Sequence, residues 1–172
     1  MSIETPFAAG TAVVRPEWID YNGHMNVGYY HVAFDQASEP FFEWLGLTPE
    51  FRKRTNCSTF ALESHLTFVR EVKEGAPLRF EARLLEFDHK RIHFYSEMFH
   101  GTEGWLAATF ESLGVYVDMS KRRTTTMPPE LLQRLEDVYH AHLSLPKPWQ
   151  VGHVISARSV PRTPAAAPAA SN

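Results

Sequence analysis

Three polar side chains occupy alternate positions in one short stretch: a carboxylate at Asp20, an amide at Asn22 and an imidazole at His24. A helical pattern of apolar residues begins directly after them, at residue 26. The first turn of a helix has unpaired N–H groups and the positive end of the helix dipole, which suit an anionic transition state. The stretch therefore gathers a general base or nucleophile, a hydrogen-bond donor and a titratable ring at a helix N-terminus.

The residues around this stretch predict the elements that position it. Residues 11–15 form a β-branched run ended by Pro16, which predicts a first strand. Residues 26–45 carry apolar side chains at helical spacing, and Asn26 is a suitable N-cap. Pro40 predicts a break or kink in this helix, because it lacks an N–H and its ring clashes with the preceding turn.

Beyond a polar connection at residues 46–56, the apolar period changes from helical to alternating. Four strands are predicted, over residues 58–70, 78–87, 91–100 and 105–117, with a final helix over residues 130–142. Short hairpins between strands imply an antiparallel sheet, against which the long helix must bury its apolar stripe. The predicted fold is α+β, an antiparallel sheet wrapped around a long central helix, plus a C-terminal helix. An open edge strand favours pairing with a second copy, so we expect a homodimer or homotetramer.

Composition limits the partners and the location of the chain. Its 172 residues are 44% hydrophobic and 22% charged, which fits one globular domain over residues 1–145. Residues 146–172 are rich in Pro and Ala and predict a tail that is disordered at its end. A net charge of −3 gives no nucleic-acid footprint or membrane-binding basic patch, and no run is long enough to span a bilayer. A single cysteine, Cys57, and an N-terminus without a signal-peptide pattern predict a cytoplasmic location.

The spacing of Asp20, Asn22, His24 and Asn26 resembles the D-x-N-x-H-V-N-N signature of hotdog-fold thioesterases. The chain also resembles the betainyl-CoA thioesterases of carnitine degradation. That likeness rests on residues 17–26 (EWIDYNGHMN), 62–65 (LESH), 71–75 (EVKEG), 89–93 (HKRIH), 106–109 (LAAT) and 117–118 (VD). The resemblance implies the hotdog fold and hydrolysis of an acyl-CoA thioester to the free acid and coenzyme A. Coenzyme A is then part of the substrate, and no separate cofactor is expected.

The resemblance makes Asp20 the catalytic carboxylate. Asp20 either attacks the thioester carbonyl to form a mixed anhydride or deprotonates a water molecule. Asn22 would orient the carbonyl or the water, and His24 would assist proton transfer or donate to the oxygen. The oxyanion donors would be the first N–H groups of the helix, at Asn26, Val27 and Gly28. The alternative is structural: Asn22 and Gly23 form a turn that Asp20 merely caps.

Other residues are weaker candidates for the site. Glu63 would be a supporting or alternative carboxylate, or an ordinary exposed residue of its strand. The candidates for binding coenzyme A phosphates are Arg70, Lys90 and Arg91, which are equally typical of scattered surface cations. The candidates for an acyl pocket that surrounds a quaternary ammonium are Trp18, Tyr21, Tyr30, Phe34 and Trp105, although core packing explains most such rings. No credible metal-binding set is present.

Two other functions fit the same fold. Hotdog enoyl-CoA hydratases resemble D-x-N-P-x-H, with the histidine five residues after the aspartate. Here His24 follows Asp20 by four residues and Gly23 replaces the proline, which favours the thioesterase pattern. A non-catalytic acyl-CoA-binding protein is the second alternative. The sequence lacks the nucleophile elbow, the P-loop and the dinucleotide-binding glycine motif, so serine hydrolases, NTPases and dinucleotide enzymes are not indicated.

Overall fold

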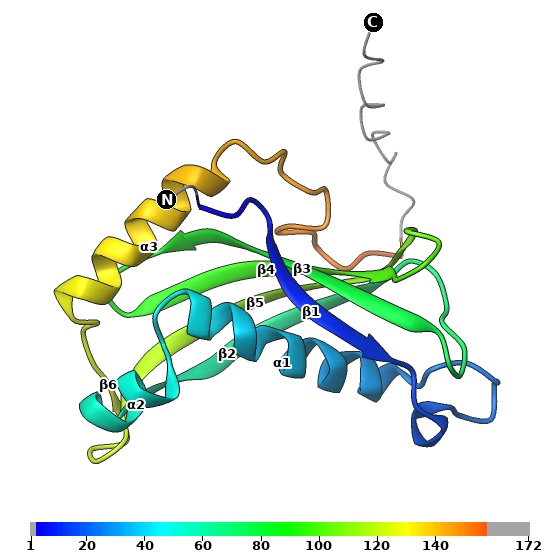
Figure 1. Cartoon of the computed structure of the whole chain (residues 1–172), viewed down its shortest axis with the longest axis horizontal. Coiled ribbons are helices and arrows are strands. Elements are labelled where there is room, and N and C mark those ends of the chain that lie inside the picture. Colours follow the sequence, from blue (N-terminus) through cyan, green and yellow to red (C-terminus); the bar gives the residue numbers. More distant parts are fainter. Residues whose placement is uncertain (1–2, 158–172) are drawn as a thin grey trace, which may run out of the picture.

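The computed structural model of the chain describes residues 3–157. A curved antiparallel sheet wraps around one long helix, as predicted (Figure 1). The helices are α1 (Val27–Trp44), α2 (Pro49–Thr55) and α3 (Pro129–His142), and a 3-10 turn, η1, spans Pro16–Trp18. The strands are β1 (Phe7–Val13), β2 (Cys57–Phe68), β3 (Pro77–Phe87), β4 (Arg91–His100), β5 (Leu106–Asp118) and β6 (Arg123–Thr124). None of the helices described is both long and apolar enough to cross a bilayer.

The order of the strands differs from a simple series of hairpins. The sheet runs β1-β3-β4-β5-β2, and β6 pairs with β5. Hairpins join β3 to β4 and β4 to β5 as predicted, but the predicted hairpin between β2 and β3 is wrong. β2 pairs with β5 instead, with Thr67 opposite Thr109, while β1 occupies the place beside β3. Among the described residues, this order leaves β2 as an unpaired edge of the sheet.

The long helix matches its predicted bounds closely. Asn26 caps it, since its Oδ1 accepts the N–H of Gly28 at 2.9 Å. The helix continues through Pro40, so the predicted break is wrong, and the alternative of a kink stays a prediction. Pro40 is exposed, and water can therefore hydrate the carbonyl that its missing N–H leaves unpaired. The predicted connection over residues 46–56 contains α2, which is capped by Thr48.

Aromatic rings on α1 fill the inner face of the sheet. Phe34 and Phe41 are fully buried. Phe34 stacks on Phe110 of β5 with ring centroids 5.3 Å apart, and Phe41 packs on Phe94 of β4 at 5.8 Å. Burying such side chains stabilises the fold by about 1.5–3 kcal/mol each. The sheet therefore holds α1 along its length and fixes the position of its first turn.

The segment that follows α3 covers part of the outer face of the sheet. Arg83 of β3 donates to the Pro146 carbonyl at 2.9 Å, and the Gly152 N–H donates to Glu111 at 2.8 Å. Arg83 also lies over the ring of Tyr95, which is completely buried. Residues 146–157 of the predicted tail thus contact the sheet. The disorder predicted for its end concerns residues 158–172, which lie outside the part of the chain described.

Candidate active site

The loop between η1 and α1 forms a tight turn around Asp20. Asp20 Oδ1 accepts the backbone N–H of Asn22 at 2.8 Å, and its carbonyl accepts the N–H of Gly23 at 3.0 Å. Gly23 has φ +77°, a left-handed conformation that glycine adopts without steric cost. The Asp20 N–H donates to the His24 carbonyl oxygen at 3.2 Å. These bonds fix the backbone from which the half-buried Asp20 carboxylate projects.

Asn26 joins this turn to the helix. Its Oδ1 accepts the Gly28 N–H, and its Nδ2 donates to Asp20 Oδ2 at 3.2 Å. The two partners define the orientation of the amide, because only the NH₂ group can donate to the carboxylate. The Asp20 carboxylate is therefore held at the N-terminus of α1, where the helix dipole stabilises negative charge. The predicted N-cap role of Asn26 is confirmed, whereas its bond to Asp20 was not foreseen.

A segment distant in sequence anchors the turn to the sheet. The Met25 N–H donates to the Val72 carbonyl at 2.9 Å, and Met25 is 1% exposed. Tyr30 meets the ring of Phe68, at the end of β2, edge-on at 5.1 Å. Burial raises the pKa of Tyr30, and its hydrogen bond to the Val72 backbone partly opposes the rise. The Asp20 turn, the start of α1 and the end of β2 are thus packed together.

One backbone donor at the helix start is unused. Of the three N–H groups predicted as oxyanion donors, that of Asn26 donates to the Trp18 carbonyl at 2.8 Å, and that of Gly28 is capped by Asn26. The Val27 N–H has no acceptor within residues 3–157, and Val27 is 59% exposed. Val27 therefore offers a free N–H one residue beyond the side chain that holds Asp20.

Asn22 and His24 contribute differently from Asn26. The Asn22 side chain is exposed and makes no hydrogen bond within the described chain, so Asn22 supports the turn through its backbone. His24 Nδ1 donates to the Met25 carbonyl at 3.2 Å, and its Nε2 has no hydrogen-bond partner within residues 3–157. Neither side chain bonds the Asp20 carboxylate. Their roles toward a substrate stay predictions.

Residues 14–135 match the model of the family described as the thioesterase-like superfamily. The chain belongs to this superfamily. It is 37% identical over 142 residues to the betainyl-CoA thioesterase of Pseudomonas aeruginosa, which covers 83% of this chain and 89% of that protein. It is 32% identical over 160 residues to the L-carnitine dehydrogenase/betainyl-CoA thioesterase of Agrobacterium fabrum. That match covers 93% of this chain and 32% of the longer protein.

Solved structures show the same fold. A Staphylococcus aureus protein in complex with CoA superposes with a TM-score of 0.81 at 24% identity, covering 92% of this chain and 100% of that one. A putative thioesterase from Pseudomonas putida superposes with a TM-score of 0.76 at 23% identity, covering 91% and 99%. These structures show the hotdog fold, and the family match and the 37% identical relative show that the chain is an acyl-CoA thioesterase.

The aromatic residues predicted for the acyl pocket of this thioesterase do not form one cage. Phe34 lies in the core below α1, and Trp18 is buried against Tyr29, with ring centroids 5.8 Å apart. Tyr21 is 96% exposed at the tip of the Asp20 turn. Tyr30 packs beside the turn but is itself 4% exposed. Most of these rings support the site through packing, and the structure does not gather them around a shared space.

The three predicted phosphate-binding cations also separate. Arg70 follows β2, near the Asp20 turn, and its guanidinium lies 4.2 Å from the ring centroid of Trp105. Lys90 and Arg91 belong to the turn between β3 and β4, at the opposite end of the sheet. There the carboxylate of Asp88 accepts the N–H groups of both residues and the Arg91 Nε–H. Of these three cations, only Arg70 lies at the same end of the sheet as the Asp20 of its own chain.

Glu63 lies away from Asp20, on the outer side of the sheet. Together with His93 and Glu111 it lines a cavity of about 390 Å³ on the face opposite α1. His93 Nε2 lies 2.8 Å from a Glu111 carboxylate oxygen. The described residues contain no group of three or more His, Cys, Asp or Glu side chains arranged to hold a metal. Within a single chain, Glu63 is thus not placed as an alternative carboxylate for Asp20.

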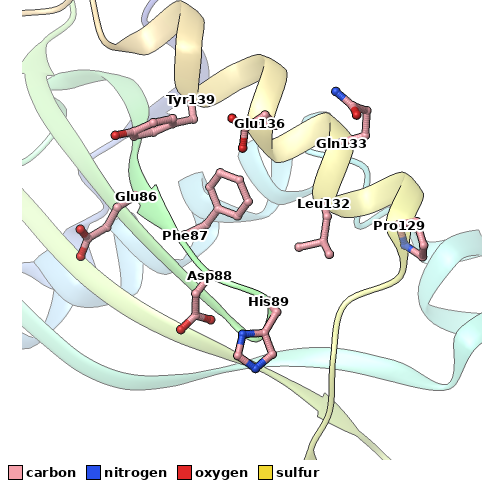
Figure 2. A pocket seen from close by; sticks show the side chains of 9 residues that line it. All are labelled: Glu86, Phe87, Asp88, His89, Pro129, Leu132, Gln133, Glu136 and Tyr139. Carbon is pink, nitrogen blue, oxygen red and sulfur yellow. The ribbon is translucent and has the colours of Figure 1, made fainter.

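An open cavity of about 730 Å³ lies between α3 and the β3–β4 turn, with the rings of Phe87 and Tyr139 and the carboxylates of Glu86, Asp88 and Glu136 around it (Figure 2). Burial alone would raise the pKa of Asp88. The N–H groups of the next residues and the neighbouring guanidinium outweigh burial and lower that pKa, so the carboxylate stays charged. This cavity lies beside the β3–β4 turn, at the end of the sheet opposite Asp20.

A smaller cavity, of about 170 Å³, lies between α1 and β2. His31 and Asp35, one helical turn apart on α1, line it together with Phe60 of β2 and Phe110 of β5. His31 and Asp35 are not among the site residues predicted from the sequence. Their signal was the i, i+4 spacing of two polar residues beside the apolar stripe of the helix.

Proposed function

We propose that this thioesterase hydrolyses betainyl-CoA to glycine betaine and coenzyme A in carnitine catabolism. The observation that best supports thioester hydrolysis is the position of the Asp20 carboxylate. Asn26 holds it at the N-terminus of α1, beside the free N–H of Val27. The acyl group is proposed from the Pseudomonas aeruginosa relative, whose match covers most of both chains. An anionic group and an unused donor at one helix start suit a reaction in which a carbonyl oxygen becomes negative.

Two routes use these groups. In the first, an Asp20 oxygen attacks the thioester carbon, the C–S bond breaks, and water then hydrolyses the mixed anhydride. In the second, Asp20 takes a proton from water, whose oxygen attacks the same carbon before the C–S bond breaks. In both, the Val27 N–H stabilises the oxyanion and His24 Nε2 is available to accept a proton. Both end in a free acid and a protonated thiol.

Heavy-oxygen labelling separates the two routes. The enzyme, in excess over acyl-CoA, carries out a single turnover in H₂¹⁸O. It is then digested, and the peptide that contains Asp20 is analysed by mass spectrometry. The nucleophilic route puts ¹⁸O into the Asp20 carboxylate when water attacks that side of the anhydride. Label in the released acid alone excludes attack of water on the Asp20 side of an anhydride and agrees with the general-base route.

We also propose that the thioesterase is a homodimer joined through β2. This strand is a free edge of the sheet and carries exposed apolar side chains, at Phe60, Leu62 and Phe68. The other edge, β1, is shorter, with 7 residues against the 12 of β2. A long apolar edge is the type of surface that a second copy covers. Size-exclusion chromatography with light scattering measures the mass directly.

The remaining proposals concern cofactors and location. We propose that catalysis needs no metal or resident cofactor, because Asp20 and the helix start supply the chemistry described. Dialysis against EDTA is expected to leave the turnover rate unchanged, and a loss restored by a divalent metal would contradict this. The cytoplasmic location is proposed from the sequence alone.

A panel of acyl-CoA substrates tests the proposed activity. We expect betainyl-CoA to give the highest kcat/KM when free thiol is followed with a thiol-reactive dye. Butanoyl-CoA and benzoyl-CoA supply short aliphatic and aromatic comparisons. Equal or higher kcat/KM for either would contradict betainyl-CoA as the substrate. A hydratase would release no thiol from an enoyl-CoA, and a non-catalytic binding protein would release none from any member of the panel.

A further inference from the structure

The cavity between α1 and β2 has the chemistry of a site for a small organic cation. The rings of Phe42, Phe60 and Phe110 are among the groups that line it, and the Asp35 side chain adds a carboxylate. Aromatic faces attract a quaternary ammonium through their quadrupoles, and a nearby carboxylate adds a direct charge interaction. The volume, about 170 Å³, leaves room for a small head group only.

The charges that line this cavity leave one carboxylate without a partner. Glu39 and Arg52 form an ion pair with each other and so cancel. Asp35 makes no hydrogen bond or ion pair within residues 3–157, although His31 lies one turn away and packs on Phe110 at 5.3 Å. The cavity therefore presents an unpaired negative charge, which a cationic ligand would neutralise.

The Asp20 of the same chain is too far along the helix to use this cavity for betaine. Asp35 lies nine residues beyond Asn26, which corresponds to about 14 Å along the axis of α1. In betainyl-CoA a single methylene separates the ammonium nitrogen from the thioester carbonyl. A head group in this cavity therefore cannot place its carbonyl at the Asp20 of its own chain.

A second copy removes this mismatch. Phe60 and the cavity lie at one end of β2, whereas Phe68, which contacts Tyr30 beside the Asp20 turn, lies at the other. When two β2 strands pair antiparallel about a two-fold axis near their middle, the Phe60 end of one copy lies beside the Phe68 end of the other. The cavity of each copy then faces the Asp20 turn of its partner.

We propose that the cationic head of the acyl group is held in this cavity of the second copy, with the partner's Asp35 as its counter-charge. The reacting carbonyl then lies at Asp20 of the first copy. This inference rests on the proposed function and names the residue that would give it specificity. Asp35 acts through recognition of the acyl group, and the chemical step belongs to Asp20.

A pair of isosteric substrates tests the charge directly. Betainyl-CoA and 3,3-dimethylbutanoyl-CoA differ only in N⁺ against C at the trimethyl centre. In the Asp35→Asn variant, we expect kcat/KM for betainyl-CoA to fall about 10- to 100-fold, because a close charge pair is lost in a partly desolvated site. We expect kcat/KM for the neutral isostere to stay within about twofold, because packing is unchanged. The matched control is Glu43→Gln, which removes an exposed carboxylate of α1 that does not line the cavity.

The outcomes separate the inference from the proposed function. A wild-type preference for betainyl-CoA over its isostere that is retained in Asp35→Asn overturns the role of Asp35 alone. An equal fall on both substrates also overturns it, because the effect would then be structural. A wild-type ratio near one overturns both the proposed substrate and the cationic cavity.

Mixed dimers test whether the site is shared. Asp20→Asn and Asp35→Asn chains are co-expressed with different affinity tags and purified through both tags. If each site takes Asp20 from one copy and Asp35 from the other, the mixed dimer has one intact site and about half of the wild-type betainyl-CoA activity. If both residues come from one chain, no site is intact, and activity no higher than that of the parent variants overturns the shared site. A monomeric wild type overturns it as well.

Discussion

Two polar clusters of this molecule differ in how much of their hydrogen-bonding capacity is already used. On the outer face of the sheet, Arg83 donates to Glu97 and to the Pro146 carbonyl, both at 2.9 Å. Burial raises the pKa of Glu97, although the charge of Arg83 opposes the rise. The two ring nitrogens of His93 lie 3.1 and 2.8 Å from carboxylate oxygens of Glu86 and Glu111. These groups are occupied by one another.

At the start of α1 the opposite holds. The Asp20 carboxylate takes one N–H on each oxygen and keeps lone pairs free, the Val27 N–H has no acceptor within residues 3–157, and His24 keeps an unbonded Nε2. The outer cluster is as rich in titratable groups as this turn. Unused donors and acceptors at a helix terminus, and not the density of charged residues, thus distinguish the candidate site from a structural network.

The largest expected effect is the loss of turnover in Asp20→Asn. We expect kcat to fall by about a thousandfold or more, because an amide is neither a useful nucleophile nor a base. The melting temperature should fall slightly, since the amide oxygen can still accept the N–H of Asn22 but the amide NH₂ cannot accept from Asn26 Nδ2. Thiol release from acyl-CoA measures turnover, and Asp137→Asn, an exposed change on α3, is the matched control. Turnover near the wild-type level would remove Asp20 from the mechanism.

Substitutions of Asn26 should have a smaller effect, and they distinguish its positioning of Asp20 from its role as the helix N-cap. Asn26→Ala should lower kcat by about 10- to 100-fold through misplacement of Asp20. It should also lower the free energy of unfolding by about 1 kcal/mol through loss of the cap. Asn26→Asp keeps a capping oxygen for Gly28 but sets a second carboxylate beside Asp20. We therefore expect the Asp variant to retain stability and lose activity, as measured by urea unfolding and thiol release. Full activity in it would refute a positioning role.

His142 of α3 is a second titratable group whose hydrogen bonds are already used within the fold. Its Nδ1 accepts the Leu84 N–H at 2.9 Å, and its Nε2 donates to the Glu4 carbonyl at 3.0 Å. Burial lowers its pKa, so the folded state keeps the ring neutral. Below about pH 6.5 the unfolded chain binds more protons at this site than the folded one, and stability is lost as the pH falls toward 5.

His142→Phe tests this assignment. It should lower the free energy of unfolding at pH 7.5 by about 1–3 kcal/mol, because the Leu84 N–H is left unpaired. The variant should also lose less stability than the wild type between pH 7 and 5, as measured by urea titrations. The turnover of the folded variant should match that of the wild type. An unchanged pH slope would show that His142 is not the group responsible.

The smallest effect is expected on the outer face. His93→Gln should change kcat/KM by less than about twofold and the free energy of unfolding by less than about 1 kcal/mol, because one flanking carboxylate is largely exposed. The acyl-CoA assay and urea unfolding measure both quantities. A large loss of activity would break the comparison, since an occupied cluster would then matter to catalysis.

Much of the fold could be predicted from local patterns. The alternation of residues 78–87 and 91–100 and the helical spacing after Asn26 gave elements close to those observed. The position of β2 could not be predicted this way, because its partner, β5, lies about 50 residues along the chain and pairing at that separation leaves no local signal. The helix break predicted at Pro40 does not occur, because solvent exposure makes the missing hydrogen bond tolerable.

In the candidate site too, contacts between sequence neighbours could be predicted, whereas contacts between distant segments could not. Asp20 and the cap at Asn26 are neighbours in sequence and could be predicted from spacing. The anchor at Val72 and the cavity at Asp35 depend on which segments the sheet brings beside α1. The aromatic residues predicted to line one acyl pocket lie apart in the structure; Phe34 is in the core and Tyr21 is exposed on a turn. Tertiary packing decides which rings are buried, and residue type alone does not.

The contacts of the segment after α3 determine where the chain can be cut or extended. A fusion partner joined at residue 145 would deprive Arg83 of the Pro146 carbonyl and Glu111 of the Gly152 N–H. It would also expose to water the sheet face on which Tyr95 is buried. A fusion joined after residue 157 leaves these contacts in place. The Pro-rich run therefore begins as part of the folded enzyme, although its composition alone resembles that of a linker.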